Sequence, residues 1–224
     1  MQKNEEVSSA GAQKGRFLFA TIFTIVFPIF TLLSPLPIMI FNLLFLPFTI
    51  VHELGHLLVI SLLLPFLNPQ LEFYLFDGVF CCACLTTNEF PHCWQTIIVM
   101  LAGSFSVLSF SLFCCFALFK VRSGDFYVIG KYYFIFGLLA DLPNLLPILP
   151  SSLGFTTDGF AINTCLYQMG YSLLISDMMS HVFSLISIIM VLASFFFLGS
   201  FFYRLGEIVV RKFEKENEIG SVCS

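Results

Sequence analysis

The chain has 224 residues, of which 58% are hydrophobic and only 11% are charged, and its mean hydropathy is +0.94. A soluble domain carries about 25% charged residues, so this composition excludes an ordinary soluble fold and predicts an integral membrane protein. The net charge of −4 is too small to indicate a nucleic-acid partner, and eight cysteines in a membrane protein of this size do not predict a secreted disulfide scaffold.

The N-terminal part contains a polar segment and then an apolar one. Residues 1–15 are mixed in charge and rich in Ser, Gly and Gln, which predicts a disordered tail. The apolar run 17–33 is long enough to span a membrane. A signal peptide is the alternative, but the run is long for one and no small-x-small cleavage site follows it. Ser34-Pro35-Leu36-Pro37 ends this helix.

The elements that follow are mostly helical. A second helix is predicted over roughly 38–64, and further helices over roughly 92–119, 126–142 and 176–203. Between the second and third helices, two β-prone runs within 71–86 flank Asp77-Gly78, which predicts a β-hairpin. The hairpin is too short to span and too apolar to be fully solvated, so we expect it to be membrane-associated and packed against helices.

These elements predict an all-α membrane protein, a polytopic helical bundle of about five transmembrane helices with a small membrane-associated β-hairpin. Residues 16–204 would form a single multi-pass membrane domain within the lipid bilayer. Residues 205–224 would form a charged C-terminal tail that can continue as a surface helix.

The second helix carries His52-Glu53-Leu54-Gly55-His56. Two histidines four apart lie on one face of a helix, so both imidazoles can reach one Zn²⁺ ion, with Glu53 as general base. Ionisable groups within a membrane span are costly and by default mark a functional site. A pair of buried histidines without metal is the alternative; haem ligation is disfavoured, because residues four apart on one helix cannot reach opposite faces of one porphyrin.

A catalytic zinc site needs a third protein ligand. Asp158 has the best context, since it follows a proline-rich segment, 143–150, whose irregular backbone can line a cavity. It opens a short helix running to Tyr167, so its alternative role is that of a helix N-cap. Asp141 is the second choice, and His92 and His181 are weaker candidates.

The cysteines offer a competing site. Cys81, Cys82, Cys84 and Cys93 cluster with His92 around the hairpin and its exit. Their spacing is not that of a zinc knuckle. A second metal or iron–sulfur site, a disulfide such as Cys81 or Cys84 with Cys93, and apolar packing are the three interpretations.

The helical HELGH motif, the later Asn144-Leu-Leu-Pro segment and the Asp158-Gly159 pair together resemble the site-2 protease family of intramembrane zinc metalloproteases. That family also has a membrane-associated hairpin and a helix with a small-residue motif, matched here by Ala102-Gly103-Ser104. The resemblance covers roughly residues 38–170. It implies that His52, His56 and Asp158 bind Zn²⁺ and that Glu53 is catalytic.

The resemblance implies an enzyme, a zinc metalloendopeptidase that cleaves a membrane protein or signal-peptide substrate in or near a transmembrane helix. Asn144 would hydrogen-bond the substrate or the developing oxyanion. The sequence departs from the family pattern at Thr157, where a leucine is usual, and in the longer spacing between Asn144 and Asp158. A catalytically inactive scaffold of the same fold and a metal-binding transporter are the alternative functions.

The orientation in the membrane has two interpretations. All ten Lys and Arg residues lie in three clusters, within 3–16, 120–131 and 204–215. The positive-inside rule places the second and third clusters in the cytosol. Five full crossings, the charges beside the first span and the family resemblance instead favour a cytosolic N-terminus and an external C-terminus. A re-entrant first segment would satisfy all three clusters, but residues 17–33 have the pattern of an ordinary span, so we expect the orientation with a cytosolic N-terminus.

Overall fold

The computed structural model describes residues 2–73, 83–86, 92–120, 125–146, 157–170 and 177–222. These residues are helical apart from one two-stranded sheet and short connections, which confirms the all-α bundle. The elements in chain order are α1 (Gln2–Leu33), α2 (Pro35–Leu63), β1 (Gln70–Phe73), β2 (Ala83–Thr86), α3 (Cys93–Lys120), α4 (Asp125–Asp141), the 3₁₀ helix η1 (Leu142–Leu145), α5 (Asp158–Gln168) and α6 (Asp177–Val222).

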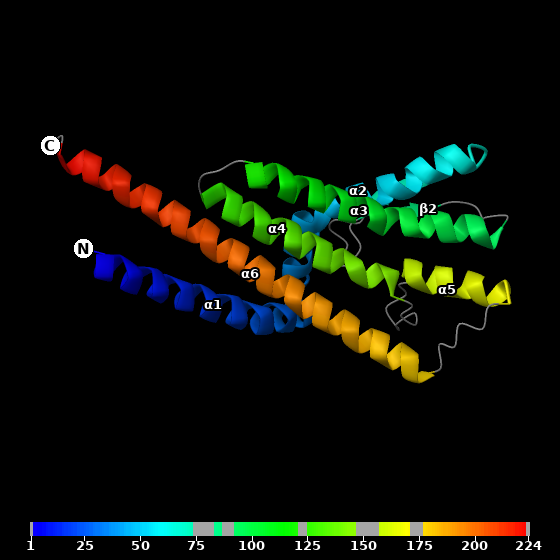
Figure 1. Cartoon of the computed structure of the whole chain (residues 1–224), viewed down its shortest axis with the longest axis horizontal. Coiled ribbons are helices and arrows are strands. Elements are labelled where there is room, and N and C mark those ends of the chain that lie inside the picture. The colour runs from blue at the N-terminus through cyan, green and yellow to red at the C-terminus, as the bar shows by residue number, and fades with distance from the viewer. Residues whose placement is uncertain are drawn as a thin grey trace.

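The helices form an elongated bundle (Figure 1). Both termini, the end of α3 and the start of α4 lie toward one end, which we call the terminal end. β2, α5 and the end of α2 lie toward the opposite end, called the distal end. α1 extends from the terminal end only to about the middle of the bundle, and α2 continues from there to the distal end. Because α1 stops halfway, the chain begins and ends at the same end of the bundle.

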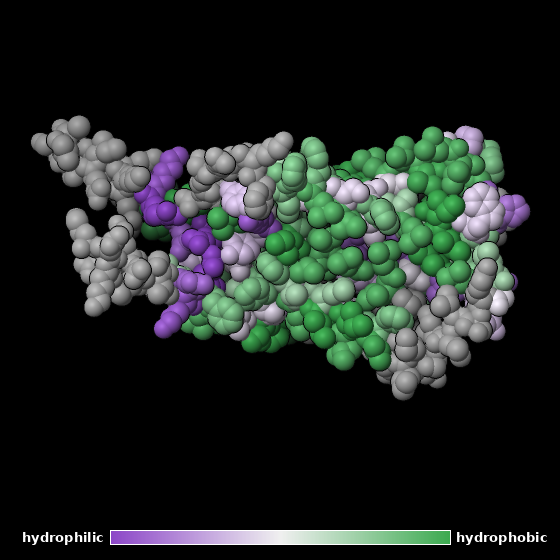
Figure 2. Space-filling model, in the orientation of Figure 1, coloured by the Kyte–Doolittle hydropathy of each residue, from purple (hydrophilic) through white to green (hydrophobic). Residues whose placement is uncertain are grey.

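Within the described residues, four helices are long and apolar enough to cross a membrane, over Gly11–Phe30, Met39–Leu63, Cys93–Leu118 and Val182–Phe213. Figure 2 shows a hydrophobic middle that a hydrophilic band borders at the terminal end. Another span was expected over 126–142. There α4 has 17 residues, or about 25 Å of helix, which is shorter than a hydrocarbon core of about 30 Å.

Prolines mark the boundary between the first two helices and also lie within them. Ser34 separates α1 from α2, as predicted, and its hydroxyl accepts a hydrogen bond from the Leu36 amide at 3.3 Å. Pro47 lies inside α2, where it removes one helical hydrogen-bond donor. One turn earlier, the Leu44 carbonyl accepts a hydrogen bond from the Tyr133 hydroxyl of α4 at 2.7 Å. A backbone acceptor near the proline therefore has a partner within the bundle.

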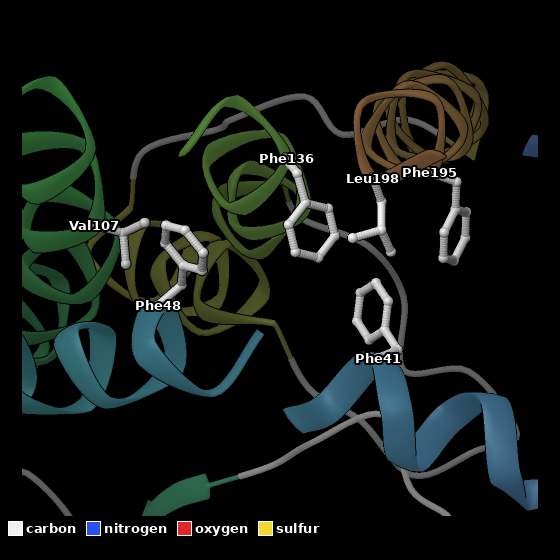
Figure 3. Packing of buried hydrophobic residues seen from close by; sticks show 6 residues of the cluster. All are labelled: Phe41, Phe48, Val107, Phe136, Phe195 and Leu198. Carbon is white, nitrogen blue, oxygen red and sulfur yellow. The ribbon is translucent and has the colours of Figure 1, made fainter. Parts of the chain in front are cut away.

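Aromatic residues pack together where α2, α3, α4 and α6 meet (Figure 3). Phe41 and Phe136 meet edge to face, with ring centroids 5.7 Å apart and planes at 90°, and Phe48 meets Phe136 at 6.3 Å and 87°. The quadrupoles of aromatic rings favour this geometry. We call this cluster the phenylalanine layer; its buried members are Phe41, Phe48, Val107, Phe136, Phe195 and Leu198.

β1 and β2 pair antiparallel, which confirms the predicted hairpin pairing. A two-residue turn at Asp77-Gly78 would place Gln70 opposite Leu85. The structure instead pairs Gln70 with Thr86, one residue away from that register. Asp77 and Gly78 themselves lie outside the described residues, and the place of the hairpin in the membrane stays a prediction.

The two ends of the chain are helical. The segment 1–15, expected to be a disordered tail, is instead the first half of α1 from Gln2 onward. At the other end α6 continues to Val222, as a surface helix was expected to do. Neither segment contains proline, so a helix that nucleates in the neighbouring apolar run can propagate into it. Disorder was predicted for residues 1–15 from their composition alone, and composition does not take into account that a neighbouring helix can extend into a segment.

The phenylalanine layer should contribute strongly to stability. Phe48 is fully buried, so Phe48→Ala should lower the free energy of unfolding by about 3–5 kcal/mol. Phe113 on α3 is 70% exposed, and the matched control Phe113→Ala should change it by less than about 1 kcal/mol. Both values can be measured by circular dichroism as denaturing detergent is added to mixed micelles. Equal losses for the two variants would contradict this packing.

Candidate metal centre

α2 buries three ionisable side chains in the bundle. His52, Glu53 and His56 have exposed fractions of 6%, 8% and 5%. The two histidines lie one turn apart on one face of the helix. Their Nε2 atoms are 2.9 Å apart and their ring planes stand at 82°. Buried ionisable groups within an apolar helix of this length usually mark a functional site.

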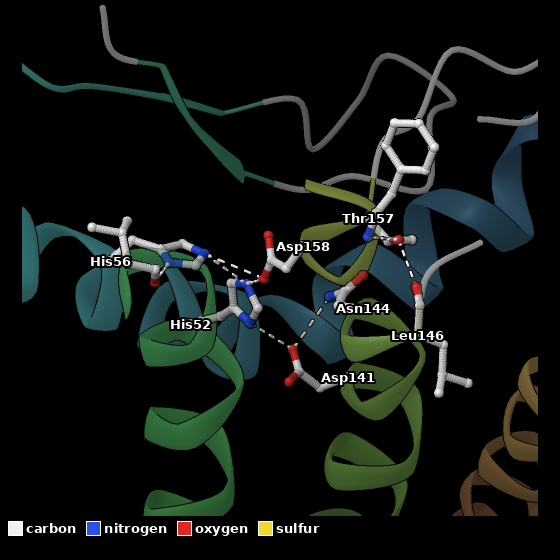
Figure 4. A network of polar contacts seen from close by, with 9 residues as sticks. His52, His56, Asp141, Asn144, Leu146, Thr157 and Asp158 are labelled. Carbon is white, nitrogen blue, oxygen red and sulfur yellow. Dashed lines mark hydrogen bonds and ion pairs between the residues drawn. The ribbon is translucent and has the colours of Figure 1, made fainter. Parts of the chain in front are cut away.

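Asp158 approaches the two histidines from the first turn of α5 (Figure 4). Its Oδ2 atom lies 3.0 Å from His52 Nε2 and 3.5 Å from His56 Nε2. Residues that are far apart in the sequence thus meet, as the sequence predicts for this set. Glu53 is buried on the same helix, directly after His52.

The second nitrogen of each imidazole has a partner that sets its protonation. His56 Nδ1 lies 2.7 Å from the Val99 carbonyl oxygen, an acceptor, so this nitrogen carries the hydrogen. His52 Nδ1 lies 2.9 Å from Asp141 Oδ1, and that oxygen also accepts from Asn144 Nδ2 at 3.5 Å. With both Nδ1 atoms protonated, each neutral ring presents an unprotonated Nε2.

These contacts place three acceptors face to face. The two Nε2 lone pairs and the Asp158 carboxylate repel one another in a buried site unless a metal ion or a proton lies between them. Their ligand atoms all lie within 4.8 Å of one another, and they form the group with metal-ligand spacing within the part of the chain that the structure describes.

The spacing of the three atoms fits a tetrahedral ion. With metal–ligand distances of about 2.0–2.1 Å, neighbouring ligand atoms of such a site are roughly 3.3 Å apart. The observed distances of 2.9, 3.0 and 3.5 Å bracket that value. Two imidazoles and one carboxylate are a donor set that suits Zn²⁺ and leaves one position open for water.

Gly103 on α3 keeps the space in front of the two rings free. A Cβ atom at Gly103 would come within 2.5 Å of His52 Nε2 and 2.6 Å of His56 Nε2. Gly55, between the two histidines, likewise packs against the Ala102 carbonyl oxygen. The two glycines let α2 and α3 approach closely, and Gly103 also leaves room for an ion.

Thr157 and Gly159 position Asp158. Thr157 is the N-cap of α5: its hydroxyl accepts from the Phe160 amide at 3.2 Å and donates to the Leu146 carbonyl at 2.7 Å. A Cβ atom at Gly159 would overlap the backbone at the end of η1, so glycine lets α5 approach η1. Asp158 therefore does not act as the cap, and its carboxylate is available to the histidines.

The structure places Asp141 beside His52 and Asn144 beside Asp141. Asp141 was the second choice for the third ligand, but it contacts the ring nitrogen of His52 that faces away from Asp158. This is the usual position of a carboxylate that orients a metal-binding histidine. Asn144 lies beside Asp141, and its contact with a substrate stays a prediction. The sequence could single out Asp141 as functional, because it is a carboxylate at the end of an apolar helix. Its partner, His52, becomes visible only in the packing of α4.

Two of the other candidate ligands, His92 and Cys93, are not part of this group. His92 is exposed. Cys93 is a free thiol that donates to Gln168 Oε1 at 3.0 Å, so it is not in the disulfide considered above. The side chains of His181 and of the other cysteines in the hairpin cluster lie outside what the structure describes.

Comparisons with known proteins give no relative: no family model, curated protein or solved structure matches the chain. The candidate site therefore rests on the geometry of this chain.

Gly103→Ala should remove the metal from the folded protein, because the added methyl group would occupy the space in front of both Nε2 atoms. Zinc content can be measured by elemental analysis of the detergent-purified chain. Gly206→Ala is the control, since a Cβ atom there meets nothing within 4 Å, and it should keep full zinc content. A folded Gly103→Ala chain with unchanged zinc would place the ion elsewhere.

The two aspartates should differ in their effect on metal affinity. Asp141→Asn removes an orienting contact and should weaken zinc binding by about 10–100-fold. Asp158→Asn removes a charged ligand and should weaken binding further. Competition with a chelator measures both, with Glu207→Gln, whose partner is Arg204, as the control. If Asp141→Asn had the larger effect, Asp141 would be the ligand.

Proposed function

We propose that this chain is a multi-pass, membrane-embedded zinc endopeptidase of the site-2 protease type, which cleaves a peptide bond in or near a transmembrane or signal-like helix. The observation that carries the proposal is the convergence of His52, His56 and Asp158, with Glu53 buried next to His52 in the same helix. The same four residues are those that the resemblance in the sequence indicates. Among the described residues, no other group of side chains supports a different reaction equally well.

The side chains have distinct roles in this proposal. A zinc ion bound here would supply a Lewis acid for the scissile carbonyl and a water of lowered pKa. Glu53 would accept a proton from that water and pass it to the leaving amine. Asp141 and the Val99 carbonyl hold the two imidazoles in the tautomer that binds a metal. Asn144 would support Asp141 from the far side.

The phenylalanine layer disfavours the alternative of a metal transporter. Phe48 precedes His52 on α2 and Phe136 precedes Asp141 on α4, so the layer lies between the candidate site and the terminal end. An ion crossing the bundle would have to pass these packed rings. Hydrolysis needs access from one side alone.

Glu53→Gln should separate metal binding from catalysis, because Glu53 is proposed as a base and not as a ligand. The variant should keep its zinc and lose cleavage of a quenched fluorescent peptide with a membrane-spanning apolar stretch, by about 10²–10⁴-fold. His52→Ala and His56→Ala should lose both zinc and activity.

Two outcomes would change the assignment. Release of zinc from Glu53→Gln would make Glu53 a ligand. A wild-type chain that binds zinc but cleaves none of a panel of such peptides would favour the inactive scaffold, and zinc flux into proteoliposomes would favour the transporter.

The arrangement of the termini supports one orientation. The Arg16 guanidinium lies 5.5 Å from the centroid of the Tyr132 ring, and Gly15 lies beside the Tyr203 ring. The three basic clusters of the sequence therefore gather at the terminal end. We infer that α1 and α2 together make one crossing, with a re-entrant first segment, and that the terminal end is cytosolic. This differs from the orientation with an external C-terminus that the family resemblance favours.

Thiol labelling tests this orientation, in a chain whose other cysteines are replaced by serine. Native Cys223 and a cysteine introduced as Ser8→Cys should both react with an impermeant maleimide only after the membrane is permeabilised. Asn68→Cys at the distal end should react in intact cells and serves as the control. If Cys223 reacts in intact cells and the cysteine of Ser8→Cys does not, the two termini lie on opposite sides of the membrane. That result would favour the topology of five successive crossings.

A further inference from the structure

A second site lies at the terminal end, on the other side of the phenylalanine layer from the metal centre. There a cavity of about 480 Å³ opens between α1, α4 and α6. This volume is within the range of roughly 300–1,000 Å³ for small-molecule sites. Its lining combines cationic and polar side chains, Lys14, Arg16 and Ser200, with the aromatic side chains of Phe17, Tyr132 and Phe196.

The cavity is lined by two cations, Lys14 and Arg16. Arg16 is held over the Tyr132 ring at 5.5 Å by a cation–π contact, and Lys14 lies on the same helix at the cavity wall. Among the residues that the structure describes, no carboxylate pairs with either cation; the nearby Glu207 pairs with Arg204. The cavity therefore attracts an anion.

The aromatic wall leads onto a lipid-facing surface. Phe17 and Phe196 meet edge to face at 5.8 Å and 65°, and Phe17 is 65% exposed. From there, exposed Leu18, Ile22 and Ile25 continue along α1 toward the middle of the bundle. These residues recur at helical spacing and form an apolar track. A ligand with an anionic head and an apolar tail would match both the cavity and this track.

We propose that the cavity binds the phosphate headgroup of an anionic phospholipid, with one acyl chain lying along α1. Lys14 and Arg16 pair with the phosphate, and the Ser200 and Tyr132 hydroxyls line the same cavity as donors. The hydrophilic band in Figure 2 lies at this end of the hydrophobic middle, at the level where headgroups would lie. Basic pockets at the cytosolic ends of transmembrane helices are suited to anionic lipids, which are enriched in that leaflet. The proposal does not depend on the peptidase activity.

Tryptophan quenching by brominated lipids tests this site in the full chain. The sole tryptophan, Trp94, begins α3 at the distal end. The reporter is Phe17→Trp in a Trp94→Phe background, reconstituted in phosphatidylcholine vesicles that contain brominated phosphatidylglycerol or brominated phosphatidylcholine. Half-maximal quenching should need an about fivefold lower mole fraction of the anionic lipid. The native chain, reporting from Trp94, should show no such preference.

Charge variants of the reporter assign the preference to the cavity. The double variant Lys14→Gln with Arg16→Gln should abolish the preference for the anionic lipid. The double variant Lys14→Arg with Arg16→Lys keeps both charges and should retain this preference. Comparing the two variants separates an effect of charge from an effect of misfolding. Arg211→Gln with Lys212→Gln alters exposed cations outside the cavity on α6 and should also retain the preference.

Three results would overturn the proposal. The first is equal quenching of the reporter by both brominated lipids. The second is an equal loss of preference in the Arg211 and Lys212 double variant, which would indicate general surface charge. The third is loss of the preference when free glycerol phosphate is added, which would indicate a soluble phosphate ligand.

Discussion

The polar centre of this bundle depends on one constraint: two imidazole nitrogens and one carboxylate oxygen face one another at 2.9 to 3.5 Å in apolar surroundings. Lone pairs this close need a metal ion or a shared proton between them. The three side chains come from α2 and α5. In the sequence, β1, β2, α3, α4 and η1 lie between these two helices. A cation in this place therefore joins two parts of the chain, and metal binding would contribute directly to the stability of the fold.

The residues around this centre act by geometry and not by ligation. Gly103 leaves space in front of the imidazoles, and Gly159 lets α5 pack against η1. Thr157 caps α5 and donates to the Leu146 carbonyl, so the first turn of α5 is fixed against the chain that precedes it. Asp141 fixes the ring of His52. Each contact restricts where a ligand atom can lie, which is how a site of three side chains becomes preorganised.

The sequence predicted those parts of the site that local helix geometry determines. His52, Glu53 and His56 lie on one stretch of helix, so their relation follows from the helical repeat. The break at Ser34 follows from proline chemistry in the same way. The partner of Asp141 could not be predicted, because it depends on how α4 packs against α2. The role of Thr157 also appears only in three dimensions: the position where family resemblance expected a leucine is a helix cap that contacts Leu146.

The phenylalanine layer explains why the polar groups gather at one level of the bundle. Packed rings exclude water from the terminal side of the candidate site, so charges there interact in a low dielectric and each buried polar group needs a partner. Contacts to Asp141 and Val99 supply such partners for the imidazoles. The same layer separates the site from the basic clusters at the terminal end. Because α1 ends halfway and α2 continues, both termini can lie with those clusters, which leaves the distal end to α5 and the hairpin. Chain topology and core packing thus divide the molecule into a basic end, which holds both termini, and an opposite end, which holds α5 and the hairpin, with the candidate metal centre on the distal side of the phenylalanine layer.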